Sequence, residues 1–116
     1  MSRLLHPTHP LQLAWGLLLW SVWFVLIYVV QALSCVSPAP HAAAHPTAVN
    51  TALLMIGVGF TAVMVWMMWR CLRASRQAAL PPTGRFIALT AAVLHGTATF
   101  STLFVALPLW RLPPCL

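Results

Sequence analysis

The chain has 116 residues, of which 61% are hydrophobic and only 5% are charged. All of its formal charge, +6 at pH 7, comes from arginine, because the sequence contains no lysine, aspartate or glutamate. So little polar surface cannot cover a water-soluble core, and the composition indicates a membrane protein. The lack of carboxylates excludes paired-carboxylate hydrolysis, carboxylate sites for Mg²⁺ or Ca²⁺, and proton relays through aspartate or glutamate, unless a partner supplies these groups.

Three apolar segments are each long enough to cross a bilayer. A spanning helix needs about 20 apolar residues, and the segments cover residues 11–35, 49–71 and 86–109. Strands would instead need a closed barrel of about eight or more, which three segments cannot build. The sequence therefore predicts an all-α, three-helix transmembrane bundle, with residues 1–116 forming a single membrane domain.

The two connectors differ in charge, which predicts the orientation. The connector 36–48 has no arginine, whereas the chain around the connector 72–85 carries Arg70, Arg73, Arg76 and Arg85. Because positive charge favours the cytoplasmic side, we predict a cytoplasmic loop at 72–85 and a periplasmic loop at 36–48. Arg3 then places the N-terminus in the cytoplasm, and three spans place the C-terminus in the periplasm, with Arg111 against the rule. The expected location is a bacterial inner membrane, as a multi-pass protein, and no nucleic-acid partner is expected.

The tryptophans fit the same orientation. Trp15, Trp66 and Trp69 fall near the inner membrane interface and Trp110 near the outer one, as an aromatic belt requires. We predict these four as interface anchors. Trp20 and Trp23 sit deeper and are expected to pack between helices.

Two of the three cysteines could form a disulfide, and the third would remain unpaired. Cys35 and Cys115 fall on the predicted outer side, which is oxidising in a bacterial inner membrane, and Cys71 falls on the reducing inner side. We favour a Cys35–Cys115 disulfide. Two unpaired thiols are the alternative. A lipid-modified Cys35 is a weaker one, because Ala-Leu-Ser-Cys only loosely resembles a lipobox and the preceding apolar run is longer than a signal-peptide core.

His95 is the most informative polar residue, because an ionisable group near the middle of a membrane span is a candidate functional site. Counted from the inner end of each helix, Ser21, Thr61 and His95 come to similar depths. We expect a neutral His95 to hydrogen-bond with Ser21 or Thr61. The alternatives are an axial haem ligand, with the second ligand from another subunit or copy, and a hydrogen bond to a partner subunit.

Small and hydroxyl residues surround His95 along the third helix. Alanine or glycine recurs every four residues, a spacing that lets helix backbones approach closely, and two threonines share the face of His95. We predict that this polar seam forms a helix or partner interface through Ala88, Ala92, His95, Gly96, Thr99 and Thr102.

The remaining motifs do not point to a cofactor. Met55, Met64, Met67 and Met68 lie within or at the end of a span, which favours packing or lipid contact over copper binding. His41 and His45 have no evident third ligand, so they predict only weak adventitious metal binding. We therefore expect no catalytic residue, no metal site and no cofactor of the chain's own.

The two ends of the chain resemble a known group. The runs WGLLLWSVWFVLIYVVQALSC (15–35) and FVALPLWRLPPC (104–115) are similar to the small three-helix proteins found alongside caa3-type cytochrome c oxidases in proteobacteria. The shared elements are Tyr28, Gln31, Leu33 and Cys35 and the terminal Pro-Pro-Cys that ends at Cys115, whereas the middle and His95 match no element of the group.

The resemblance implies an accessory or assembly role and no catalytic residue. The sequence thus predicts a non-catalytic subunit of a larger respiratory membrane complex, expected to be a haem–copper cytochrome c oxidase. Its partners would be larger integral membrane subunits and lipids, with haem and copper held by the partner complex. The alternatives are a self-assembling small channel or transporter, and a haem or quinone protein based on His95 and the tryptophans.

Overall fold

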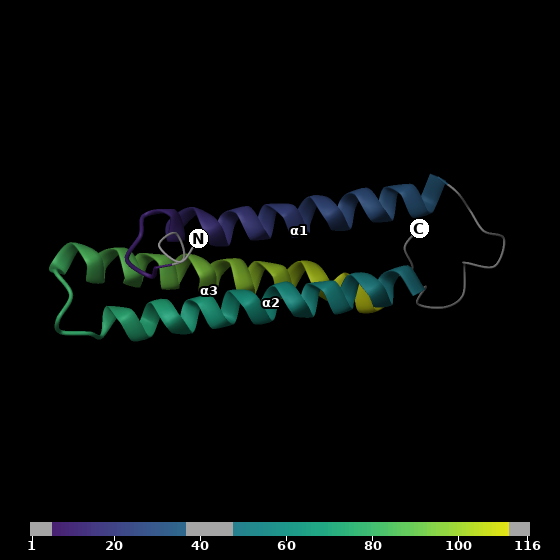
Figure 1. The fold of residues 1–116 in the computed structure, drawn as a ribbon. Coiled ribbons are helices and arrows are strands. Elements are labelled where there is room, and N and C mark those ends of the chain that lie inside the picture. The colour runs from purple at the N-terminus through teal and green to yellow at the C-terminus, as the bar shows by residue number, and fades with distance from the viewer. Residues whose placement is uncertain (1–5, 37–47, 112–116) are drawn as a thin grey trace.

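The computed structural model describes residues 6–36 and 48–111, which form three long helices and no strand. These are α1 (Leu11–Val36), α2 (Ala48–Ser75) and α3 (Pro82–Arg111). Each is long and apolar enough to cross a membrane. The helices lie side by side along their length (Figure 1), which confirms the predicted three-helix membrane fold; its orientation across the bilayer stays a prediction.

The helices that flank the arginine-rich connector are longer than predicted. The helix α2 continues to Ser75 and α3 begins at Pro82, so the connector is 76–81 and the predicted loop 72–85 is too long. Proline is tolerated in the first turn of a helix, where its missing N–H would have no partner. The side chain of Arg85 donates a hydrogen bond from Nε to the carbonyl of Ser75 at 3.1 Å, which satisfies one of the free carbonyls at the end of α2.

The segment 6–10 packs at the same end of the bundle as this connector. Pro7 lies against Arg70 and Cys71, and a Cβ atom on Gly84 would lie 3.5 Å from the methyl carbon of Thr8. We call this the connector end, and the end where α1 stops and α2 begins the opposite end. The N-terminal segment and the connector therefore share one side of the bundle, as the predicted topology requires.

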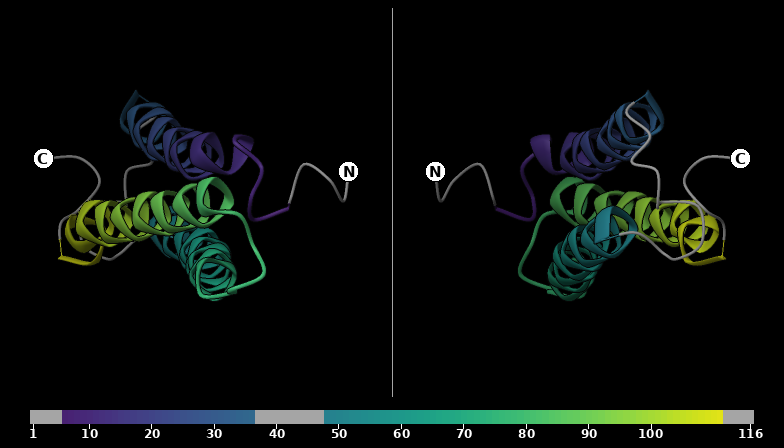
Figure 2. Two further views of the ribbon diagram at one scale, coloured as in Figure 1. Left: turned by 90° about the vertical axis from the view of Figure 1, so that its left-hand side faces the viewer. Right: turned by 90° about the vertical axis from the view of Figure 1, so that its right-hand side faces the viewer.

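Seen end-on, α3 lies between the other two helices (Figure 2) and packs along both of them, whereas α1 and α2 contact each other less. Two clusters of buried apolar side chains fill the interior. The one nearer the opposite end holds Trp23, Ile27, Leu53 and Leu109. The other, near the connector end, holds Cys71, Ala91 and Ala92, whose small side chains let the helices approach closely.

Trp23 of α1 fits against a glycine of α2. Its ring is 0% exposed, and a Cβ atom on Gly57 would lie 2.7 Å from Cζ2 of that ring. Phe60 covers the ring further, with its centroid 5.9 Å away. The expected packing of Trp23 between helices is confirmed, whereas Trp20 is half-buried and stacks on Phe24 of its own helix at 5.1 Å.

Two further contacts of the same kind join the other helix pairs. A Cβ atom on Gly16 of α1 would lie 2.6 Å from Nδ1 of His95, which belongs to α3. A Cβ atom on Gly96 of α3 would lie 3.2 Å from Sδ of Met68, which belongs to α2. With the contact of Trp23 and Gly57, there are three such contacts. Each helix contributes one large side chain to one contact and one glycine to another.

We predict that Gly57→Ala lowers the free energy of unfolding by about 1–3 kcal/mol, the usual cost of overpacking a tight interior. The added methyl would collide with a rigid, fully buried ring. The matched control is Gly59→Ala two residues away, where no heavy atom lies within 4 Å of the Cβ position. We expect that control to be neutral or slightly stabilising, because alanine favours helix.

The measurement is unfolding in mild detergent by titration with a denaturing detergent, followed by circular dichroism. Equal effects of the two substitutions would contradict the assigned packing of Trp23.

Candidate functional site

The polar seam predicted on α3 faces the interior of the chain itself. Ala88, Ala92, His95 and Thr102 are buried, and Gly96 and Thr99 are half-buried. The helix interface predicted from these residues is therefore formed with α1 and α2. The predicted contact of the His95 face with a partner subunit is corrected, because α1 already occupies that face through Gly16.

The ring of His95 has no hydrogen-bond partner among the described residues, at either Nδ1 or Nε2. The predicted bond to Ser21 or Thr61 is wrong. Ser21 is exposed and donates to the carbonyl of Leu17 in its own helix at 2.8 Å, and Thr61 lies on an apolar groove between α2 and α3. Similar depth in the membrane did not bring these residues together, because rotation about each helix axis decides which neighbours meet.

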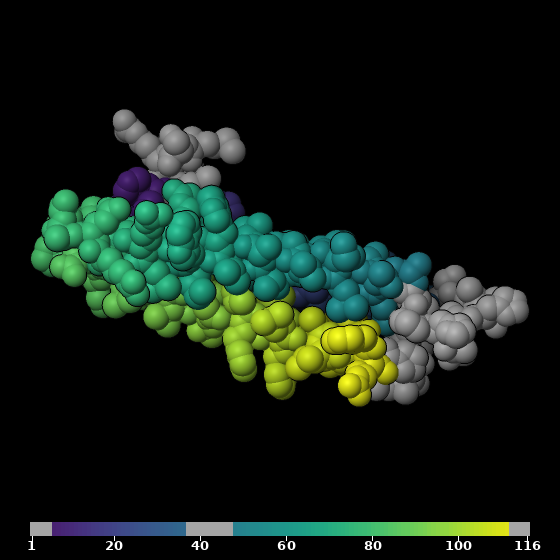
Figure 3. Space-filling model, turned by 90° about the horizontal axis from the view of Figure 1, so that it is seen from below, coloured from purple at the N-terminus to yellow at the C-terminus, as the bar shows by residue number. Residues whose placement is uncertain are grey.

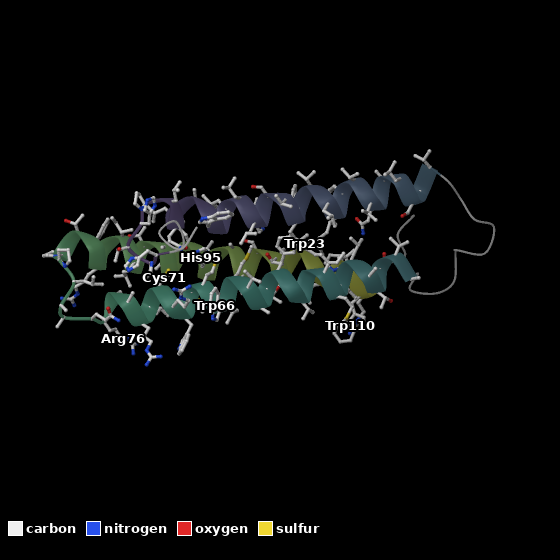
Figure 4. The ribbon with its side chains drawn as sticks, viewed as in Figure 1. Trp23, Trp66, Cys71, Arg76, His95 and Trp110 are labelled. Carbon is white, nitrogen blue, oxygen red and sulfur yellow. The ribbon has the colours of Figure 1, made fainter. Side chains whose placement is uncertain are left out.

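The burial of His95 restricts access of a haem iron to its ring. The ring is 0% exposed, so an iron could reach either nitrogen only if α1 moved away from α3. His95 lies along the bundle between Cys71 and Trp23 (Figure 4). Across the described part of the chain, no three His, Cys, Asp or Glu side chains gather as a metal site. His41 and His45 lie outside the described residues, and their weak metal binding stays a prediction.

The threonine hydroxyl groups near His95 donate hydrogen bonds to carbonyl groups of α3. Thr99 donates to the carbonyl of His95 and Thr102 to that of Ala98, both at 2.8 Å. The hydroxyl of Thr102 also lies 3.9 Å from Sδ of Met64. Because the seam is closed inside one chain, it does not offer the polar, outward-facing surface that a self-assembled pore would need.

An apolar groove with a volume of about 790 Å³ lies between α2 and α3. On α2 its wall includes Gly57, Thr61 and Ala62, which are small. On α3 the wall is aromatic, with Phe100, Phe104 and Trp110. Figure 3 shows this side of the molecule, where side chains from the second half of α3 stand out from the surface.

The four predicted aromatic anchors are exposed or half-buried, and their role at the membrane interfaces stays a prediction. Trp66 and Trp69 are about half exposed on α2, and Trp110, at 76% exposed, lies near the opposite end. Trp15 is half-buried near the start of α1.

Two of the four predicted cytoplasmic arginines lie on these anchors. Arg70 lies 4.8 Å from the centroid of Trp66, and Arg73 lies 5.3 Å from that of Trp69. Arg76 is exposed beyond them, and Arg85 binds the end of α2. The connector end is therefore strongly basic and aromatic at once.

Cys35 and Cys71 lie toward opposite ends of the bundle, and the side of the membrane that each faces stays a prediction. Cys71 is free and buried against Ala91 and Ala92. Cys35 lies in the last turn of α1. Cys115 lies outside the described residues, so its pairing with Cys35 stays a prediction.

Several buried residues that join the helices were not predicted from the sequence. Gly16 and Gly57 accept the rings of His95 and Trp23, and only their small size in otherwise bulky helices could have signalled this. Asn50 is buried and donates from Nδ2 to the carbonyl of Leu109 at 3.3 Å, which joins α2 to α3 at the opposite end. Gln12 is buried one turn before Gly16. A lone amide within an apolar span is the signal that marks Asn50.

Comparisons with known proteins identify no relative of this chain. No protein-family model matches this chain, and no curated protein or solved structure is similar to it at a significant level. The function is therefore argued from the residues and their arrangement.

We predict that His95→Leu leaves the free energy of unfolding unchanged or raises it by up to about 2 kcal/mol. A buried nitrogen without a partner carries a desolvation cost that an apolar side chain of similar size removes. Thermal unfolding in mild detergent measures this, with Thr102→Leu as a comparison that overpacks the same helix face. A loss of stability in His95→Leu would show that the ring holds a hydrogen bond in the membrane.

Proposed function

We propose that this chain is a non-catalytic accessory or assembly subunit of a larger membrane complex. The observation that carries the proposal is the apolar groove between α2 and α3, which we propose receives a transmembrane helix of the larger subunit. Helices in a bilayer associate through close van der Waals contact at small residues rather than through a hydrophobic driving force. Thr61 and Ala62 provide such a floor, and the volume of about 790 Å³ exceeds that of any single side chain.

The aromatic wall of the groove supports a protein partner. Phe100 and Phe104 are 70% and 67% exposed, so most of each ring is free to contact a neighbour. Helices pack by placing side chains of one helix into grooves of the other. The exposed rings on α3 could pack in this way against a partner helix that lies on the small residues of α2. The chain contributes no carboxylate of its own, so any acid–base or metal chemistry of the complex belongs to the partner.

The expected complex is a haem–copper cytochrome c oxidase in a bacterial inner membrane. The resemblance at residues 15–35 and 104–115 to proteins found alongside caa3-type oxidases supports this choice. The second of these runs includes Phe104 and Trp110, which line the groove. Haem and copper would be held by the larger subunits, and this chain would cover one of their apolar flanks.

We predict that filling the floor of the groove releases the partner. Ala62→Leu adds bulk where the partner helix would approach, at an exposed position that the fold itself does not need. Overpacking of about 1–3 kcal/mol corresponds to a loss of roughly tenfold or more in partner recovery. The matched control is Ala52→Leu, also exposed on α2 but away from the groove.

The measurement is affinity purification of each variant from its native membrane in mild detergent, with mass spectrometry and an optical spectrum of the eluate. The proposal is supported if the native chain and Ala52→Leu recover oxidase subunits and haem absorption and Ala62→Leu does not. Recovery of the native chain alone, colourless and in several copies, would overturn it and favour a self-assembling membrane protein.

We also propose that a Cys35–Cys115 disulfide fixes the outer end of the bundle. The chain has three cysteines, and the buried Cys71 is the free one among the described residues. After denaturation without reductant, we expect a maleimide reagent to add once, at Cys71, and after reduction to add three times. Three additions before reduction would contradict the pairing.

A further inference from the structure

A second hollow lies at the connector end, between α2 and the segment that precedes α1. It has a volume of about 530 Å³ and is lined by His6, Trp66, Trp69, Arg70, Arg73 and Gln77, among others. Unlike the groove between α2 and α3, it combines aromatic rings with polar and cationic groups. We call it the basic pocket.

The two guanidinium groups of the basic pocket are placed to bind an anion. Arg70 and Arg73 lie over the rings of Trp66 and Trp69, at 4.8 and 5.3 Å. A guanidinium stacked on a ring keeps its in-plane N–H donors free. Within the described ranges neither group donates a hydrogen bond, and the whole sequence contains no aspartate or glutamate to pair with them.

The depth of the pocket matches the lipid headgroups. About 20 helical residues cross the hydrocarbon core of a bilayer, and α2 begins at Ala48. Trp66 and Trp69 therefore fall at the boundary of the hydrocarbon, where tryptophan is favoured. Arg70 and Arg73 fall just beyond it, at the level of the phosphates.

An open path for an acyl chain leads away from the pocket along α2. Met55, Gly59 and Val63 follow one another on the exposed face toward Trp66, at helical spacing. No heavy atom lies within 4 Å of a Cβ position on Gly59, so this face is shallow and unobstructed.

We propose that the basic pocket binds an anionic phospholipid, whose phosphodiester accepts hydrogen bonds from Arg70 and Arg73 and whose acyl chain lies along Met55, Gly59 and Val63. The charge of the chain selects the headgroup. A zwitterionic headgroup would bring an ammonium group, and the sequence has no carboxylate to receive it. A headgroup such as glycerol adds hydroxyls and no positive charge, so it leaves the two arginines without competition. The assignment does not depend on the proposed oxidase partner.

The test is native mass spectrometry of the full chain in mild detergent, titrated with phosphatidylglycerol or with phosphatidylcholine of the same acyl chains. We expect one phosphatidylglycerol per chain, bound at least about tenfold more tightly than phosphatidylcholine. The double variant Arg70→Gln/Arg73→Gln should weaken phosphatidylglycerol binding by roughly tenfold or more, since each arginine near an anionic lipid surface contributes about one kcal/mol.

The matched control is Arg76→Gln/Arg111→Gln, which removes two of the six arginines and so has the same formal net charge as the Arg70→Gln/Arg73→Gln variant. Neither residue of the control lines the pocket, and we expect its affinity to stay within about threefold of the native chain. Equal losses in the two double variants, or equal affinity for both lipids, would overturn the site. Competition by millimolar inorganic phosphate would also overturn it, because the site would then bind free phosphate rather than lipid.

A third variant keeps the test valid if the glutamine pair fails to fold. Arg70→Lys/Arg73→Lys retains both charges but loses the planar, two-pronged donor geometry of the guanidinium. We expect an intermediate affinity for phosphatidylglycerol and unchanged helix content by circular dichroism. Native affinity in this variant would show that simple charge, and not the pocket, attracts the lipid.

Discussion

Three large side chains seated on three glycines hold this bundle together. In a bilayer, an apolar side chain leaves lipid for protein with little gain from the hydrophobic effect, so close packing must supply the association. Trp23 sits on Gly57, and His95 sits on Gly16. The third contact, of Met68 with Gly96, completes a closed circle in which every helix touches both others. Any residue larger than glycine at Gly16 or Gly57 would push two helices apart.

These contacts decide what remains for function. Because His95 and Thr102 turn inward, these two polar groups are committed to the fold. The surface that is left is apolar along the spans and basic at the connector end. An apolar groove on such a surface suits another transmembrane helix, and a basic, aromatic pocket at headgroup depth suits an anionic lipid. Both proposals therefore assign binding roles to surfaces that the fold leaves free.

Hydropathy and charge predicted much of this arrangement, because length and apolarity alone decide whether a segment spans a bilayer. The packing role of Trp23 is confirmed, and Trp66 and Trp69 are exposed on α2, whereas their role as interface anchors stays a prediction. Hydropathy and charge could not give the rotation of each helix about its axis, because α1 and α2 are apolar almost all round and have no polar face to mark which side meets the seam of α3. For that reason the predicted partners of His95 were wrong, and the ring meets Gly16 instead.

The central claim is most directly tested by magnetic resonance of the isotope-labelled chain in lipid bilayers. The account predicts short-range cross-peaks between the ring of Trp23 and Gly57, between the ring of His95 and Gly16, and between the methyl group of Met68 and Gly96. It also predicts a ring-current shift of the α-protons of Gly57 that is absent at Gly59. Glycine signals without these cross-peaks and without that shift would contradict the account, because the three helices would then be held together by other contacts.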